Sequence, residues 1–201
     1  MKVALSGLSG VGSSSTARLV AAKLGLAMSN FTFRDLAKER GVSFESIQKQ
    51  AAHDVSIDKE LDRRLIKFGQ DNPHCLIATD LACWLDQEKV YKTLELEKGI
   101  AYDYKIWLEA PLEVRAKRLY EREGGDPELV KVYENQRDHD NRERYLQLYG
   151  VDIFDQSGVD WVLTTTHYNL EQVADMIVER LQSLDLKAWY AKVESCCKPR
   201  R

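Results

Sequence analysis

Apolar runs of a few residues alternate with segments of helical periodicity along most of the chain. Residues 3–5 form a short apolar run that ends at Gly7, and apolar residues then recur at helical spacing as far as Gly25. Three further runs have the length and the polar or proline-containing boundaries of buried strands, namely residues 75–79, 104–108 and 161–164. Because strands and helices alternate, the pattern predicts an α/β fold with a doubly wound parallel sheet.

The segment between the first two of these strands carries the boundaries of three short helices. Thr32, Ser43 and Ser56 are of the types that cap helix N-termini, and Gly41 and Gly69 are expected to end the first and the third helix. Three short helices in succession indicate a lid-like lobe beside the sheet.

Charged residues dominate the segment 115–144. Asp126 followed by Pro127 predicts the start of a long polar helix that continues to about Tyr149. The segment holds six arginines, two lysines and eight acidic residues. Arginine binds phosphoryl oxygens through two parallel hydrogen bonds, but mixed charges are equally typical of a solvated, salt-bridged helix surface. The composition of the segment supports both interpretations.

The arginines of this helix are distributed over more than one face. Arg137 and Arg144 are seven residues apart and therefore share a face, whereas Arg142 points elsewhere unless the helix bends or ends early.

The overall composition limits the partners and the location that we expect. A chain of 201 residues, 44% of them hydrophobic, can bury the core of one domain with small appended lobes. Its net charge of -3 gives no general attraction for nucleic acid. No stretch reaches the ~18 apolar residues of a membrane span, and the four cysteines show no zinc-binding pattern. We therefore expect a cytoplasmic protein with small-molecule partners, without nucleic acid or membrane.

The glycines near the start of the chain give the main chemical indication. Gly7 and Gly12 enclose four residues between an expected strand and an expected helix, which is the context of a phosphate-binding loop. Such a loop turns its backbone N–H groups toward a phosphate at the positive end of the helix dipole. Ser14 stands where a hydroxyl usually binds Mg²⁺, but Ser13 stands where a lysine usually reaches the phosphates. The loop predicts a nucleoside triphosphate site whose missing positive charge comes from elsewhere.

Further motifs occur in a characteristic order along the chain. They are the serine run after Gly12, Phe33–Gly41, Ile57–Asp62 with Arg64, Lys105–Arg118, Arg137, Arg142, Arg144–Tyr145 and Tyr149–Asp152. In order and spacing these motifs resemble the cytidylate kinases, specifically the short form of archaea and some bacteria. That family often has Gly-Thr-Thr-Thr in place of the lysine form of the loop, and the resemblance covers the chain to about Leu184.

The resemblance implies a P-loop NTPase fold, with a five-stranded parallel sheet flanked by helices. It implies a kinase domain over residues 1–187, with an NMP-binding lobe at about 30–70 and a LID lobe at about 118–150, followed by a tail at 188–201. The implied reaction is transfer of the γ-phosphate of ATP, with Mg²⁺ as cofactor, to CMP, dCMP or a related monophosphate.

The resemblance also implies roles for individual residues. The donor nucleotide would be bound by Gly7, Ser9, Gly10, Val11, Gly12, Ser13, Ser14, Ser15 and Arg118, with Ser14 as a Mg²⁺ ligand. The acceptor would be bound by Arg34, Asp58, Asp62, Arg64, Asp80 and Asp138, with Asp138 near the cytosine. Arg137 and Arg142 would be the catalytic residues that close over the transferring phosphoryl group. Without the resemblance, spacing alone favours a solvated acidic helix surface for Asp58 and Asp62, and Arg34 is also compatible with such a surface.

Asp80 is the main departure from the family pattern. The family has an arginine there and an acid two positions earlier, where this chain has Ala78. A carboxylate at position 80 would repel an acceptor phosphate by roughly 1 to 4 kcal/mol at ~4 Å, but it could also bind Mg²⁺ through water. Thr164 and His167 stand where the family tends to have Asn and Arg. The alternative function is therefore a nucleotide-binding sensor or binding module that has lost kinase activity.

Overall fold

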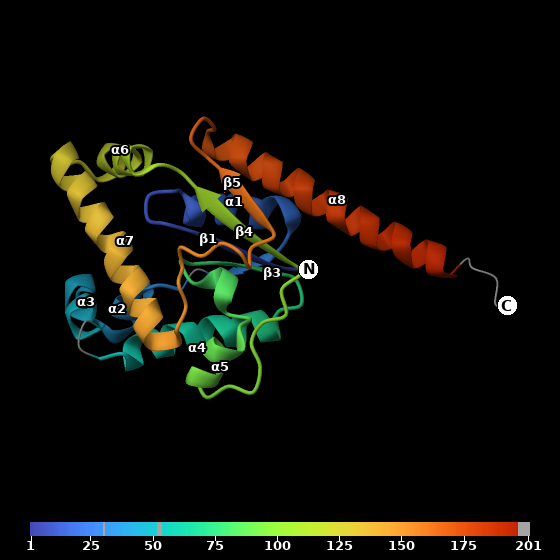
Figure 1. Ribbon diagram of the computed structural model, residues 1–201, viewed down its shortest axis with the longest axis horizontal. Coiled ribbons are helices and arrows are strands. Elements are labelled where there is room, and N and C mark those ends of the chain that lie inside the picture. Colours follow the sequence, from blue (N-terminus) through green and yellow to red (C-terminus); the bar gives the residue numbers. More distant parts are fainter. Residues whose placement is uncertain (30, 52–53, 197–201) are drawn as a thin grey trace.

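A five-stranded parallel β-sheet with helices packed on both faces forms the body of the protein (Figure 1). The computed structural model describes residues 1–29, 31–51 and 54–196. The strands are β1 (Lys2–Gly7), β2 (Ala27–Ser29), β3 (Cys75–Ala78), β4 (Tyr104–Glu109) and β5 (Trp161–Thr164). The helices are α1 (Ser13–Leu24), α2 (Phe33–Arg40), α3 (Phe44–Ala51), α4 (Ser56–Asp71), the 3-10 turn η1 (Ala82–Trp84), α5 (Glu88–Thr93), α6 (Leu112–Glu123), α7 (Pro127–Tyr149) and α8 (Leu170–Cys196).

The strand order β2-β3-β1-β4-β5 puts β1 at the centre of the sheet. Leu5 of β1 is in register with Ala78 of β3 and with Ile106 of β4, and all pairings are parallel. The carboxyl ends of the strands therefore meet at one edge, where open α/β sheets bind their ligands. The segments after β1, β3, β4 and β5 all start from this edge.

Alternate residues of β1 contribute to two separate cores. Val3 and Leu5 are buried with side chains of α1 and α8 on one face, whereas Ala4 is buried with side chains of α4 on the other. This alternation follows from the two-residue repeat of a strand, and it explains why β1 is apolar at every position from Val3 to Leu5. The predicted doubly wound α/β fold with five strands is confirmed.

Local capping patterns predicted several helix boundaries correctly. At the start of α2 the backbone N–H of Thr32 donates to the carboxylate of Asp35 at 2.8 Å, as the capping pattern predicts, and the hydroxyl of Thr32 donates to the same oxygen at 2.7 Å. The hydroxyl of Ser43 accepts a hydrogen bond from the backbone N–H of Ser46. Asp126 accepts from the first N–H groups of α7, which continues without a break to Tyr149 as expected.

Three predictions about secondary structure were wrong or incomplete. Ser56 does not cap α4, because it is the first residue of the helix and Val55 holds the cap position; the N–H of Ser56 is bound by the side chain of Asp54. Gly69 does not end α4, because the helix continues to Asp71 and a Cβ atom at position 69 would lie 2.8 Å from Ile100. Position 69 therefore requires glycine because the helix packs closely against Ile100, and not because the helix ends there. The strand β2 is too short, at three residues, to be recognised from periodicity.

Helix α8 projects well beyond the body of the protein in Figure 1. It runs to Cys196 and so passes residue 188, where the tail was expected to begin. Residues 197–201 of that tail lie outside the described residues. Within the described part of the chain, none of the helices has the length and apolar character needed to cross a membrane.

The close approach of β1 and β4 at Gly7 gives a first prediction. A Cβ atom at Gly7 would lie 2.7 Å from the carbonyl oxygen of Leu108, which cannot move without distorting β4. We expect Gly7→Ala to lower the free energy of unfolding by about 1–3 kcal/mol, measured by urea denaturation. Gly158→Ala is the control, because nothing lies within 4 Å of a Cβ atom there. Equal stabilities of the two variants would contradict this packing.

Candidate active site

Residues 7–15 form a glycine loop between β1 and the first turn of α1. Gly10 and Gly12 have φ angles of 79° and 98°, in the left-handed region that favours glycine. Such turns place successive N–H groups on one concave side, and the positive end of the α1 dipole begins at Ser13. Ser14 is exposed in this first turn. The geometry is that of an anion site built from backbone groups.

Two arginines of α6 donate hydrogen bonds to carbonyl oxygens of the glycine loop. Nη1 of Arg115 lies 2.8 Å from the oxygen of Ser9, and Nη1 of Arg118 lies 3.2 Å from the oxygen of Val11. Arg118 also donates to the hydroxyl and the carbonyl of Thr165, which follows β5. Helix α6 therefore supports the back of the loop and connects it to the end of β5.

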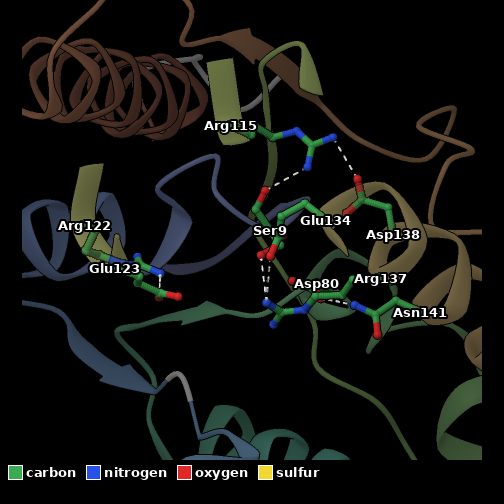
Figure 2. A network of polar contacts seen from close by, with 9 residues as sticks. All are labelled: Ser9, Asp80, Arg115, Arg122, Glu123, Glu134, Arg137, Asp138 and Asn141. Atoms are coloured by element: carbon green, nitrogen blue, oxygen red, sulfur yellow. Dashed lines mark hydrogen bonds and ion pairs between the residues drawn. The ribbon is translucent and has the colours of Figure 1, made fainter. Parts of the chain in front are cut away.

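An arginine of α7 contacts the same loop. Arg137 donates from Nη1 to the hydroxyl of Ser9 at 3.0 Å, and the same nitrogen lies 3.7 Å from the carboxylate of Glu134. Figure 2 shows these side chains converging on Ser9 together with Arg115 and Asp138. Asp138 accepts a hydrogen bond from Nη2 of Arg115 at 2.8 Å. Ser9 is thus bound by α7 at its hydroxyl and by α6 at its carbonyl group.

Glu134 and Asp138 are buried one helical turn apart on α7. One carboxylate oxygen of each has no hydrogen-bond partner among the described residues. Burial raises the pKa of Asp138, and the ion pair with Arg115 opposes this effect. The face of α7 that meets the glycine loop therefore carries both signs of charge.

Asp80 follows β3 and is attached to the same face of α7. Its Oδ2 accepts a hydrogen bond from the side-chain amide of Asn141 at 3.1 Å, and Asn141 in turn accepts one from Arg144 at 3.0 Å. Burial raises the pKa of Asp80, although the charges of Arg137 and Arg144 favour its ionised form. Residues 137, 141 and 144 of one helix therefore bridge the ends of β1 and β3.

Two buried carboxylates of α4 face the last turns of α7. Oδ1 of Asp58 lies 3.5 Å from Nε of Arg144, and its Oδ2 has no hydrogen-bond partner among the described residues. Oδ2 of Asp62 accepts a hydrogen bond from the hydroxyl of Tyr149 at 2.6 Å. Burial raises the pKa of Asp58 and that of Asp62, the latter to about 7. The alternative of a solvated acidic face is therefore wrong for both residues.

Three other predicted arginines lie in different surroundings. Arg142 donates to both oxygens of Asp152, at 2.8 and 2.5 Å, so a catalytic role requires this ion pair to open. Arg64 pairs with Glu39 at 2.6 Å on the surface of the lobe. Arg34 is exposed in the first turn of α2. The roles expected for these three arginines stay predictions.

Four residues of the site had no role assigned from the sequence. They are Arg115, Glu134, Asn141 and Arg144. A signal was present for the last three, because positions 134, 137, 141 and 144 follow the i, i+3, i+7 spacing of one helix face. Arg115 offered no such signal, because its partners come from three separate segments.

Comparison with known proteins gives a consistent family assignment. A family model described as the cytidylate kinase-like family matches residues 2–167. A cytidylate kinase of Pyrococcus horikoshii is 35% identical over 185 residues, which cover 91% of this chain and 89% of that protein. A protein named cytidylate kinase 2 from Borreliella afzelii is 34% identical over 191 residues, which cover 93% of this chain and 99% of that protein.

Solved structures of other kinases share the fold. A shikimate kinase from Acinetobacter baumannii, in complex with shikimate, has a TM-score of 0.59 and 15% identity, and the match covers 92% of this chain and 94% of that chain. A deoxyadenosine kinase from M. mycoides, with dCMP bound, has a TM-score of 0.53 and 14% identity, with 92% of this chain and 100% of that chain covered. At these identities the likeness concerns the fold alone.

The raised pKa of Asp62 predicts a specific dependence of stability on pH. An acid whose pKa is about 3.8 when unfolded and about 7 when folded favours the folded state below pH 4 and loses this contribution as the pH rises through 7. Asp62→Asn keeps an acceptor for Tyr149 but cannot titrate. From pH 4 to pH 8 the free energy of unfolding of the wild type should therefore fall by on the order of 2 to 4 kcal/mol more than that of the variant.

The measurement is urea denaturation at a series of pH values. Asp71→Asn is the matched control, because Asp71 is exposed at the end of the same helix, and its curve should run parallel to that of the wild type. If the free energies of unfolding of the wild type and of Asp62→Asn differ by the same amount at every pH from 4 to 8, Asp62 does not titrate in this range.

Proposed function

We propose that this chain, which belongs to the cytidylate kinase-like family, transfers the γ-phosphate of ATP to CMP, dCMP or a related monophosphate. Membership of the family makes the protein a nucleoside monophosphate kinase. The observation that carries the proposal for this site is the contact of Arg137 with Ser9. Through it, an arginine of the LID lies directly against a phosphate-binding loop that lacks the usual lysine.

The donor side of the proposed site is the glycine loop. Its N–H groups and the N-terminus of α1 would bind the phosphates of ATP. Arg118 of α6, which contacts Thr165 after β5, would border the rest of the nucleotide. Mg²⁺ in phosphate-transfer sites takes most of its ligands from phosphates and waters. The exposed hydroxyl of Ser14 and the carboxylate of Asp80, which follows β3, are of the types that fit this kind of coordination. When bound, the ion would neutralise charge on the phosphates.

The acceptor side of the proposed site lies between α4 and α7. An unpartnered buried carboxylate oxygen is unfavourable, and an N–H or O–H group of a ligand would compensate it. Asp58 and Asp138 each have such an oxygen, so both are suited to the amino group of cytosine or to a ribose hydroxyl. Arg34 is the proposed partner of the monophosphate group.

The reaction needs little more than positioning and positive charge. The attacking oxygen of a monophosphate is already anionic, so no general base is required. Arg137 would stabilise charge on the transferring phosphoryl group, and Arg142 would join it once its ion pair with Asp152 opens. Closing α7 over the loop would exclude water and so limit hydrolysis of ATP.

The proposed partners are small nucleotides, and the proposed location is the cytoplasm. Cys75 and Cys83 are buried free thiols, in agreement with a reducing compartment.

Assays of ADP release with CMP, dCMP, UMP and AMP test the proposed activity. We expect turnover that depends on the monophosphate and on Mg²⁺, with CMP or dCMP as the preferred acceptor, and little release of ADP without an acceptor. Binding of ATP without turnover on any of the four acceptors would contradict the proposal. It would support the nucleotide-binding sensor instead.

Substitutions of Asp80 distinguish its two proposed roles. If the carboxylate binds Mg²⁺ through water, Asp80→Asn should raise the Mg²⁺ concentration needed for half-maximal activity and lower kcat by about tenfold or more, and Asp80→Arg should abolish activity. Asp86→Asn is a control that also replaces a partly buried acid of the same segment. Higher turnover of CMP by Asp80→Arg would show instead that Asp80 only repels the acceptor phosphate.

A further inference from the structure

Arg115 connects three segments of the protein through one buried guanidinium group. Nε donates to the carbonyl of Ala110, Nη1 to the carbonyl of Ser9, and Nη2 to the carboxylate of Asp138, at 3.1, 2.8 and 2.8 Å. The side chains of Arg115 and Asp138 are 5% and 6% exposed. A single arginine thus joins the turn before α6, the glycine loop and α7.

The hydrogen bond to Ser9 orients the next N–H group of the loop. A trans peptide is planar, and its C=O and N–H groups point in opposite directions. Because Arg115 holds the carbonyl of Ser9 at the back of the loop, the N–H of Gly10 in the same peptide is turned to the opposite side. Gly10 is also packed tightly, since a Cβ atom there would lie 2.8 Å from the carbonyl oxygen of Arg115. The side chain of Arg115 therefore binds the Ser9 end of this peptide, and its backbone packs closely against Gly10.

The ion pair with Asp138 makes this arrangement depend on the position of α7. A buried guanidinium group is unfavourable without a compensating charge, and breaking one partner of a buried pair is strongly destabilising. Arg137, the neighbour of Asp138 on α7, binds the hydroxyl of the same Ser9. Movement of α7 away from the loop would therefore break the contacts of Asp138 and Arg137 together.

We propose that Arg115 is a positioning residue that couples the closing of α7 to the affinity of the glycine loop for phosphate. Arg115 acts through the peptide between Ser9 and Gly10 and touches no reacting atom. With α7 in place, Asp138 holds the guanidinium group against Ser9. This inference rests on the proposed binding of a nucleotide at the loop and adds the means by which the LID controls it.

A double-mutant cycle with ADP and inorganic pyrophosphate as probes tests the coupling. The variants are Arg115→Lys, Asp138→Asn and the double variant, and the affinities are measured by titration calorimetry without an acceptor. Lysine keeps the charge but cannot reach three acceptors with a planar group. We expect each single variant to bind both probes at least about fivefold more weakly, and the double variant to bind no more weakly than the weaker single variant.

Arg122 and Glu123 provide a matched control on the same helix. Their side chains are 67% and 56% exposed and form an ion pair at the surface, drawn apart from the network in Figure 2. Arg122→Lys, Glu123→Gln and their double variant should leave both affinities unchanged. Thermal unfolding of all six variants shows whether any loss of affinity accompanies a loss of fold.

Each outcome of the cycle decides a separate point. Failure of the wild type to bind either probe would contradict the proposed function itself. If the wild type binds the probes and Arg115→Lys and Asp138→Asn bind them with the same affinity as the wild type, the proposed role of Arg115 is overturned. The kinase proposal is then left intact. If the losses of binding free energy in the two single variants add up fully in the double variant, the coupling of Arg115 to α7 is overturned. If Arg115→Lys does not fold, weaker binding by folded Asp138→Asn supports the inference, and unchanged binding overturns it.

Discussion

Residues 7–15 contain no lysine or arginine, so the positive charge that a bound phosphate chain requires has to come from other elements. The backbone N–H groups and the dipole of α1 supply only partial charges. Three arginines donate hydrogen bonds to the loop, namely Arg115 and Arg118 to its carbonyl groups and Arg137 to the hydroxyl of Ser9. The site is therefore incomplete until α6 and α7 are packed against the loop.

Helix α7 can bring positive charge to the glycine loop because its acidic and basic side chains compensate each other where they are buried. Glu134 and Asp138 are buried on the face that carries Arg137, and the arginines offset a desolvation that would otherwise be prohibitive. The same helix continues to Arg144 and Tyr149, which bind the buried acids of α4. One rigid element thus links the proposed donor site to the proposed acceptor lobe, and a shift of this helix would affect both.

Local patterns in the sequence were sufficient for much of the fold and for part of the site. The strands other than β2, the cap at Asp126 and the turn between β1 and α1 depend on neighbouring residues, and all are present as expected. Contacts between segments that are distant in the sequence could not be predicted from local patterns. Spacing alone made Asp58 and Asp62 resemble a solvated surface, because it does not show that α7 covers them. The hydrogen bond from Arg115 to Ser9 joins residues 106 positions apart, which no periodicity reveals.

A crystal structure of the complex with ADP and CMP tests the central claim most directly, namely that α7 supplies the charge that the glycine loop lacks. The account predicts the β-phosphate of ADP on the N–H groups of the loop, and the guanidinium group of Arg137 moved from the hydroxyl of Ser9 onto phosphate oxygens. It also predicts CMP between α4 and the end of β3. Phosphates bound at the loop while Arg137 points to solvent, or a nucleotide bound at another edge of the sheet, would contradict it.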